Sequence, residues 1–339
     1  IVVMLLYIDT DKLIMYSTFY FCTNLFMFFM YRIYCLRKFE ECKMHLRWDP
    51  KLYKDIWNYV GWNSIGTFAF MANNQGITIL LNMFFSTVVN AARGIATTVS
   101  SQVSGFVMNF QVAAGPQIYK LYAKGEYQQM NRLVCNTAKY SSYLLILIGL
   151  PVFIKTEILI RLWLGNIPEY VIPFIRITLI ELFFKAIDFP IGNGIHAFGK
   201  MKLPNITSSI AYISVLPLTY IFLRLGASPV IAYIIACVSY PLAMACDLWI
   251  LNKFSGFDIK FYLLNVPLKS ILIILLSAIL PVFVSNSFED GWLNLILTSA
   301  VCAIVSAVLV FYIGLDAEMR EKVLRKVKNK LAFAFNKNT

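Results

Sequence analysis

The chain is poor in charged residues and in histidine. Asp, Glu, Lys and Arg make up only 14% of its 339 residues, and its two histidines, His45 and His196, are far apart in sequence. Soluble domains carry about 25% charged residues, so this composition excludes an ordinary soluble domain. Two isolated histidines also give no basis for a catalytic histidine.

The cysteines show no metal-binding pattern. The sequence contains no CxxC motif and no Cys/His spacing of the kind that holds a metal ion. We therefore predict neither a metal site nor a cofactor.

Long apolar runs are what the chain has in excess. Hydrophobic residues make up 59% of the sequence, and its mean hydropathy is +0.68. A helix that spans a bilayer needs about 20 apolar residues. We place such spans at 13–34, 57–80, 94–118, 138–160, 171–196, 204–224, 228–251 and 267–314, the last divided in two near Ser285–Gly291. The prediction is an all-α polytopic membrane protein with about nine helices and a linker.

Lysine and arginine alternate between the connecting segments. Of the 30 basic residues, five lie in the intervening connections and two lie inside a span, whereas 23 lie in alternate segments. Those segments are 32–55, 120–139, 199–202, 252–269 and 315–339. This is the positive-inside pattern of a bacterial inner-membrane protein, and it predicts a cytoplasmic C-terminus. The net charge of +12 therefore reports orientation in the membrane and not nucleic-acid binding.

Cysteine is absent from the segments assigned to the outside. Cys35, Cys42 and Cys135 lie in basic segments, and the other four cysteines lie within spans. No extracytoplasmic disulfide is therefore predicted.

Four regions divide the chain. Residues 1–34 contain a short apolar stretch, Ile1–Ile8, and the first span; residues 35–56 are basic; 57–252 carry six spans; and 253–339 carry two more and a basic tail. We read Ile1–Ile8 as the end of a truncated helix rather than a strand-like tail, which makes the chain the C-terminal part of a longer protein. The basic segment is either an ordinary loop or, as we favour, a linker between two helix bundles. The tail is expected to form a basic amphipathic helix on the anionic inner leaflet.

Two spans carry stripes of polar residues. One stripe consists of Asn63, Thr67, Asn74, Thr78 and Asn82, and the other of Thr98, Ser101, Gln102, Gly105 and Asn109. Their spacing places each set on one helical face. Exposing a polar helical face to lipid costs free energy, so such a face either lines an aqueous cavity or bonds to other helices. The number of amides favours a water-filled cavity.

The span 171–196 carries four ionisable residues, Arg176, Glu181, Lys185 and Asp188. Glu181, Lys185 and Asp188 share one sector of the helix, and Arg176 lies about 180° from Lys185. One interpretation is a self-neutralised structural triad, with Arg176 reaching outward. The other is a functional site, in which a carboxylate exchanges a proton or sodium ion or Lys185 meets an anionic substrate. The sector contains two acids and one base, and the acid left in excess slightly favours the interpretation as a functional site. Pro190 and the glycines after it loosen the end of this helix.

Several segments resemble one family of membrane proteins. They are 59–66 (YVGWNSIG), 89–96 (VNAARGIA), 115–126 (GPQIYKLYAKGE) and 162–165 (LWLG), in this order between the basic segment and the charged span. The chain resembles the Bacteroidetes-type polysaccharide-export flippases of the multidrug/oligosaccharidyl-lipid/polysaccharide exporter superfamily. The resemblance implies two lobes of six helices around a central cavity, often with two additional helices, giving about 14. Span 13–34 would then be helix 6, 57–80 helix 7 and 171–196 helix 10.

The same resemblance implies a function. Such proteins flip an undecaprenyl-pyrophosphate-linked oligosaccharide across the inner membrane by alternating access, for surface polysaccharide such as O-antigen, capsule or exopolysaccharide. Cavity arginines of relatives contact the pyrophosphate, and Arg93 and Arg176 are the matching residues; for Arg93, a headgroup anchor is the alternative. Relatives couple transport to a cation, H+ or Na+, through carboxylates, for which Glu181 and Asp188 are the candidates. Helix 7 has Asn73 and Asn74 in place of an acid, and helix 11 has none, which departs from the sodium-coupled pattern.

Two other functions are weighed. A cation-coupled multidrug exporter of the same fold would need a compact aromatic pocket, whereas the Asn, Gln and Ser residues suit sugars. A glycan polymerase or ligase would need a large outer loop with a base or nucleophile. The longest outer segment, Lys155–Tyr170, offers only Glu157, Arg161 and Glu169. We therefore predict a transporter and not an enzyme.

Overall fold

The computed structural model describes residues 11–43, 49–288, 291–322 and 324–325. Within these ranges the chain is helical and contains no strand, which confirms the all-α prediction. Six of the described helices are long and apolar enough to cross a membrane, as expected for a polytopic membrane protein. Two compact units are distinguished, residues 1–56 and 57–339. Ile1–Ile8, His45 and most of the basic tail lie outside the described residues.

The first unit contains helix α1 (Lys12–Lys38), a short turn η2 (Glu40–Cys42) and the start of α2 (Pro50–Phe84). The predicted basic linker is thus partly helical. Asp49 caps α2, because its Oδ1 accepts hydrogen bonds from the backbone N–H groups of Lys51 (3.0 Å) and Leu52 (3.2 Å). Pro50 follows at the first helical position, where its missing N–H costs nothing.

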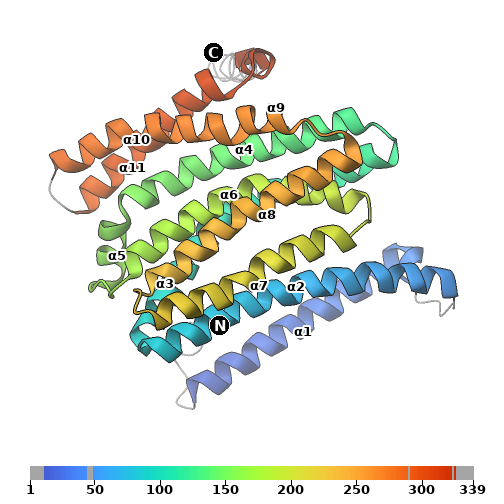
Figure 1. Cartoon of the computed structure of the whole chain (residues 1–339), viewed down its shortest axis with the longest axis horizontal. Helices are drawn as coiled ribbons and strands as arrows, with labels where there is room; N and C mark the ends of the chain where they lie inside the picture. Colours follow the sequence, from blue (N-terminus) through green and yellow to red (C-terminus); the bar gives the residue numbers. More distant parts are fainter. Residues whose placement is uncertain (1–10, 44–48, 289–290, 323, 326–339) are drawn as a thin grey trace, which may run out of the picture. The chain divides into compact units, whose positions relative to one another are not determined.

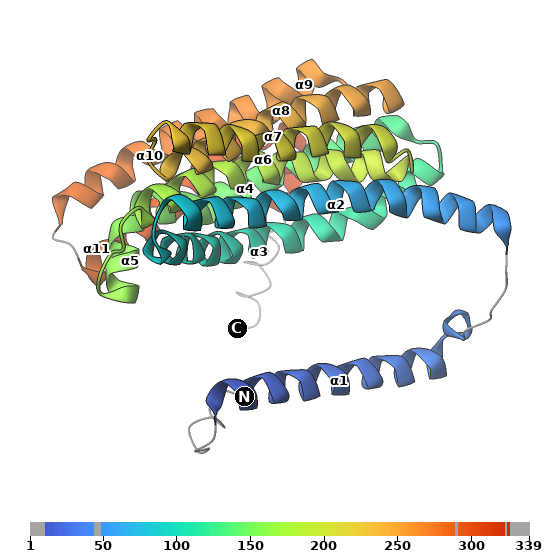
Figure 2. The same cartoon turned by 60° about the horizontal axis from the view of Figure 1, so that its bottom comes forward.

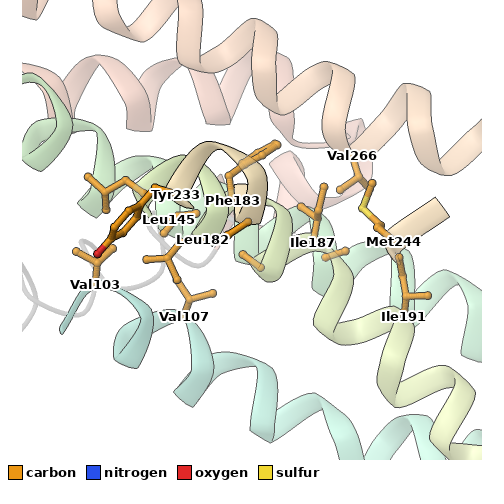
Figure 3. Close-up of a cluster of buried hydrophobic side chains, with 14 of the residues drawn as sticks. Val103, Val107, Leu145, Leu182, Phe183, Ile187, Ile191, Tyr233, Met244 and Val266 are labelled. Carbon is orange, nitrogen blue, oxygen red and sulfur yellow. The ribbon is translucent and has the colours of Figure 1, made fainter. Parts of the chain in front are cut away.

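The second unit is a bundle with α6 at its centre. Its first helices are the rest of α2, α3 (Thr87–Ala123), α4 (Tyr127–Ile154), α5 (Thr156–Leu164), α6 (Val171–Ala197), α7 (Lys202–Arg224) and α8 (Val230–Ser255). Helix α6 packs against α3, α4 and α8, and α7 packs against α8 (Figures 1 and 2). The core formed by these helices is apolar. Figure 3 shows part of it, including Val103, Val107, Leu145, Leu182, Phe183 and Tyr233.

One end of this unit is basic. The turns between α3 and α4, α6 and α7, and α8 and α9 lie together at this end, on the right in Figure 1. They fall in the lysine- and arginine-rich segments 120–139, 199–202 and 252–269. We refer to this end as the basic end, and to the other as the opposite end. Helices α6 and α8 both run from the opposite end to the basic end.

The remaining helices form a hairpin beside α4. They are α9 (Ile259–Leu263), the π-helical turn η3 (Leu264–Leu268), α10 (Lys269–Ser287), α11 (Trp292–Leu309) and the π-helical turn η4 (Val310–Gly314). The predicted division near Ser285–Gly291 is confirmed. Polar contacts join the hairpin to α4: Ser142 Oγ lies 2.7 Å from Ser270 Oγ, and Lys139 Nζ lies 3.0 Å from Asp316 Oδ1.

One predicted boundary was wrong. The span 138–160 is not one helix, because α4 ends at Ile154 and α5 begins at Thr156. The basic connecting segment 120–139 is mostly helical, because α3 and α4 cover all of it except Lys124–Glu126. The turn can be this short because Gly125 has a φ of 74°. This value lies in the left-handed region, which favours glycine and commonly ends helices.

Candidate functional site

Arg93 joins three helices near the opposite end of the bundle. Its Nε donates to Thr78 Oγ1 (3.1 Å) and its Nη2 to the backbone carbonyl of Asn74 (3.1 Å), both on α2. On α8, Tyr233 lies with its hydroxyl 3.5 Å from Nη1 and its ring centroid 5.7 Å from the guanidinium. Arg93 is therefore a structural cross-link in this conformation, in addition to being a charged group at the cavity described next.

A small cavity connects Arg93 with Glu181 of α6. Its volume is about 40 Å3, which is room for a few water molecules at most. The lining residues are Asn73, Asn74, Ile77, Arg93, Glu181, Ala232, Tyr233, Ala236 and Tyr240. A pyrophosphate does not fit in this space, so contact between Arg93 and such a group requires the bundle to open.

Glu181 and Lys185 form the predicted ion pair. Lys185 Nζ lies 2.5 Å from Glu181 Oε1, with 35% of the lysine side chain and 12% of the glutamate side chain exposed. Tyr240 of α8 lies beside the pair, because it lines the same cavity as Glu181 and its ring centroid lies 4.7 Å from Lys185 Nζ. Each charge of the pair thus has an opposite charge in contact, which offsets the cost of ionising both groups inside the bundle.

Asp188 is separate from this pair. No described ion pair includes it, and its Oδ1 is buried without a hydrogen-bond partner. The charged group that acts on it is Asp247 of α8, a residue that the sequence analysis did not single out. A lone carboxylate within the apolar span 228–251 was the available signal, since ionisable residues at membrane depth are rare and usually functional.

Arg176 is directed toward α4 instead of the cavity. Its guanidinium lies 5.8 Å from the ring centroid of Phe153, and its Nε is buried without a hydrogen-bond partner. Arg176 is also not among the residues that line the Arg93 cavity. The structure therefore does not bring the two candidate arginines together.

The polar stripes on α2 and α3 are partly exposed. Hydroxyl groups in the stripes bond to their own helices: Thr67 Oγ1 donates to the carbonyl of Asn63 (3.0 Å), and Thr98 Oγ1 to that of Gly94 (2.9 Å). Such hydroxyls need no water. The amides of Gln102 and Asn109, which are exposed on α3, are the groups of this stripe that require a polar environment.

An open groove adjoins the α3 stripe. Its volume is about 450 Å3, within the range of about 300–1,000 Å3 that is typical of ligand pockets. Its lining residues come from α3, α4 and α5 and are Thr98, Val99, Gln102, Val103, Phe106, Ile148, Val152, Leu159 and Trp163. The groove is thus apolar, with Thr98 and Gln102 as its polar members.

Comparison with known proteins identified no relative. No family model matches the chain, and no curated protein and no solved structure is similar to it. Among the described residues, no group of His, Cys, Asp and Glu side chains could hold a metal ion.

Proposed function

We propose that the chain is part of a membrane transporter that flips a lipid-linked oligosaccharide, an undecaprenyl-pyrophosphate-linked glycan, across the bacterial inner membrane. In this proposal residues 57–252 are the C-terminal lobe of a two-lobe exporter, and α9–α11 are additional helices. The basic end faces the cytoplasm, as the positive-inside rule predicts.

The observation that carries the proposal is the pairing of a polar face with an apolar groove. Gln102 and Thr98 belong to both, because they lie on the α3 stripe and also line the groove. A lipid-linked oligosaccharide is amphiphilic in the same way, with an apolar isoprenoid chain and a polar glycan. The groove suits the chain, and the exposed amides of Gln102 and Asn109 suit sugar hydroxyl groups.

Arg93 is the candidate contact for the pyrophosphate in an open state. A guanidinium can form two parallel hydrogen bonds to a phosphate. In the described state, Arg93 is held by Thr78, Asn74 and Tyr233 beside Glu181. Opening of the cavity between α2, α3 and α8 would exchange these contacts for the anion, so that substrate binding and helix movement are coupled.

The experiment is an export assay in a flippase-deficient bacterial strain that is complemented with the full-length gene. We expect that the double change Gln102→Leu and Asn109→Leu reduces surface polysaccharide at least tenfold per unit of membrane-inserted protein. The two leucines remove the sugar-binding amides while they keep α3 compatible with a membrane.

Asn265→Leu is the matched control. Asn265 is a half-buried amide whose Nδ2 donates to the carbonyl of Phe261 in its own helical segment, and it belongs to neither the stripe nor the groove. Export by this variant should remain near the wild-type level. Wild-type export by the Gln102/Asn109 double variant would contradict the proposal.

A further inference from the structure

Asp188 and Asp247 occupy corresponding positions in two neighbouring helices. Asp188 is 17 residues after the first residue of α6, and Asp247 is 17 residues after the first residue of α8. Both helices run toward the basic end and pack against each other. At 1.5 Å per residue, each aspartate is about 26 Å along its helix, and the two carboxyl groups interact electrostatically.

The surroundings of the two aspartates are apolar. Figure 3 shows Ile187 and Ile191 of α6 close to Met244 of α8 and to Val266. Asp247 is only 9% exposed. Each aspartate has a buried Oδ1 that accepts no hydrogen bond from the described residues. Burying a carboxylate oxygen without a donor or a cation is costly, so something that the two side chains share must compensate for it.

No described cation compensates for the aspartates. Lys185, on the same helix, is paired with Glu181, and Arg176 lies over Phe153. Tyr262 of α9 donates to the backbone carbonyl of Ile187 (2.7 Å). Several elements around the two aspartates contribute titratable groups. Those that interact with the pair or with its neighbours are Glu181, Lys185, Tyr240, Tyr212, Tyr262 and Cys135.

Asp188 and Asp247 are two neighbouring acidic groups, and no described ion pair gives either of them a basic partner. Two neighbouring carboxylates in a site of low polarity do not both ionise, and the usual outcome is a single shared proton. A metal ion would need several oxygen ligands, and the described residues contain no such group. A proton needs no additional space.

We propose that Asp188 and Asp247 share one proton between α6 and α8, so that the bundle contains a proton-binding site. The proton sits between two carboxylate oxygens, one acting as donor and the other as acceptor, and it satisfies both side chains. Glu181 is paired with Lys185 and is not part of the site. This assignment is independent of the transport proposal. If the transport proposal also holds, the pair is where proton binding acts on the α6–α8 interface.

The test is infrared spectroscopy of the purified, membrane-reconstituted protein at pH 7. A shared proton gives a carboxylic acid C=O stretching band, which should shift when the protein is labelled with 13C at the aspartate side-chain carboxyl carbon. The band should shift in frequency in both Asp188→Asn and Asp247→Asn, because each change removes one of the two carboxyl groups that share the proton.

The controls make the result independent of folding and of export. Asp258→Asn changes an exposed aspartate that caps α9, and asparagine is also a good cap, so the band should persist. If the unsubstituted protein shows no aspartate-derived acid band at pH 7, or if the band is unchanged in either single variant, the inference is wrong. The infrared measurement needs no substrate, so its result does not depend on the result of the export assay.

Discussion

At the scale of single residues, Glu181 and Lys185 illustrate how a helix carries charge inside a membrane. Their spacing of four residues places them on one face of α6, and the ion pair follows from that spacing. The ring of Tyr240 then adds a contact to Lys185. The pair is complete without Asp188, so the three residues do not form the triad that one sector of a helix suggests.

Removal of Lys185 should therefore destabilise the protein. Loss of one partner of a buried ion pair costs about 3–5 kcal/mol, and we expect the lower end of this range for Lys185→Ala because 35% of the side chain is exposed. The measurement is the amount of folded protein in the membrane. The double variant Glu181→Gln, Lys185→Met should recover most of the loss; a double variant as depleted as the single one would contradict a structural ion pair.

The stability of the protein should depend more on the hydrogen-bond geometry of Arg93 than on its charge. Arg93→Lys keeps the charge, but a lysine cannot reach Thr78 Oγ1 and the carbonyl of Asn74 in the same planar arrangement. We expect a loss of about 1.5–3 kcal/mol, as is typical of hydrogen bonds to charged groups, measured as a lower midpoint of thermal unfolding. Tyr233→Phe removes only the 3.5 Å contact and should cost less. If Tyr233→Phe cost more than Arg93→Lys, the main restraint on Arg93 would come from α8.

At the scale of elements, the backbone hydrogen bonding of α6 is interrupted at Pro190. Pro190 has no N–H, so the carbonyl of Ala186 lacks its usual partner within the helix. The side chain of Gln111, which is buried on α3, donates to this carbonyl at 2.7 Å. The next carbonyl, that of Ile187, accepts from Tyr262 at the same distance. The interruption is thus compensated by the packing of α6 on α3 and α9.

This explanation predicts a specific coupling between two positions. Gln111→Ala should cost about 1–3 kcal/mol, because it leaves a buried carbonyl without a donor. In a Pro190→Ala background the same change should cost distinctly less, because the substituted residue supplies a backbone N–H that can bond to the carbonyl of Ala186. A double-mutant cycle on thermal unfolding measures the difference. Equal costs in both backgrounds would show that Gln111 contributes by packing alone.

Helix α2 approaches α7 closely at Gly76. A Cβ atom at this position would lie 2.5 Å from Leu216 Cδ2, so Gly76→Ala should destabilise the protein by about 1–3 kcal/mol through overpacking. Gly61, on the same helix, has no atom within 4 Å of such a Cβ. Gly61→Ala should be neutral or stabilise by up to about 1 kcal/mol. Leu216→Ala should relieve the Gly76 variant in the same unfolding measurement.

At the scale of the whole molecule, the distribution of lysine and arginine predicts the orientation of the bundle. The helices of the second unit place the turns at 124–126 and 198–201 at the basic end and the segment 165–170 at the opposite end. An orientation with the basic end in the cytoplasm satisfies the positive-inside rule.

Cysteine labelling tests this orientation. In a cysteine-free background, Asn166→Cys should react with a membrane-impermeant thiol reagent that is added to intact cells. Lys124 is an exposed residue at the basic end. Lys124→Cys should react with the reagent only after the cells are opened. The opposite pattern would invert the topology, and labelling of both in intact cells would refute a polytopic arrangement.

The sequence by itself determined the features that depend on neighbouring residues. The apolar runs predict the helices, and the break between α10 and α11 falls where the polar residues interrupt the last run. The Glu181–Lys185 pair follows from helical periodicity. Helix ends were predicted less well: α5 is separate from α4, and Gly125 makes the turn between α3 and α4 only three residues long. An apolar run shows how much chain is compatible with lipid, but not where its backbone turns.

The partners across helices were decided only by the tertiary structure. Gln111 meets Ala186, 75 residues away, and Arg93 meets Tyr233, 140 residues away. Asp188 interacts with Asp247, not with the lysine of its own helix. Helical periodicity assigns each residue to a face, but which faces meet depends on how all the helices pack together. The site is defined by these meetings, because a buried polar group is stable only beside the group that compensates for it.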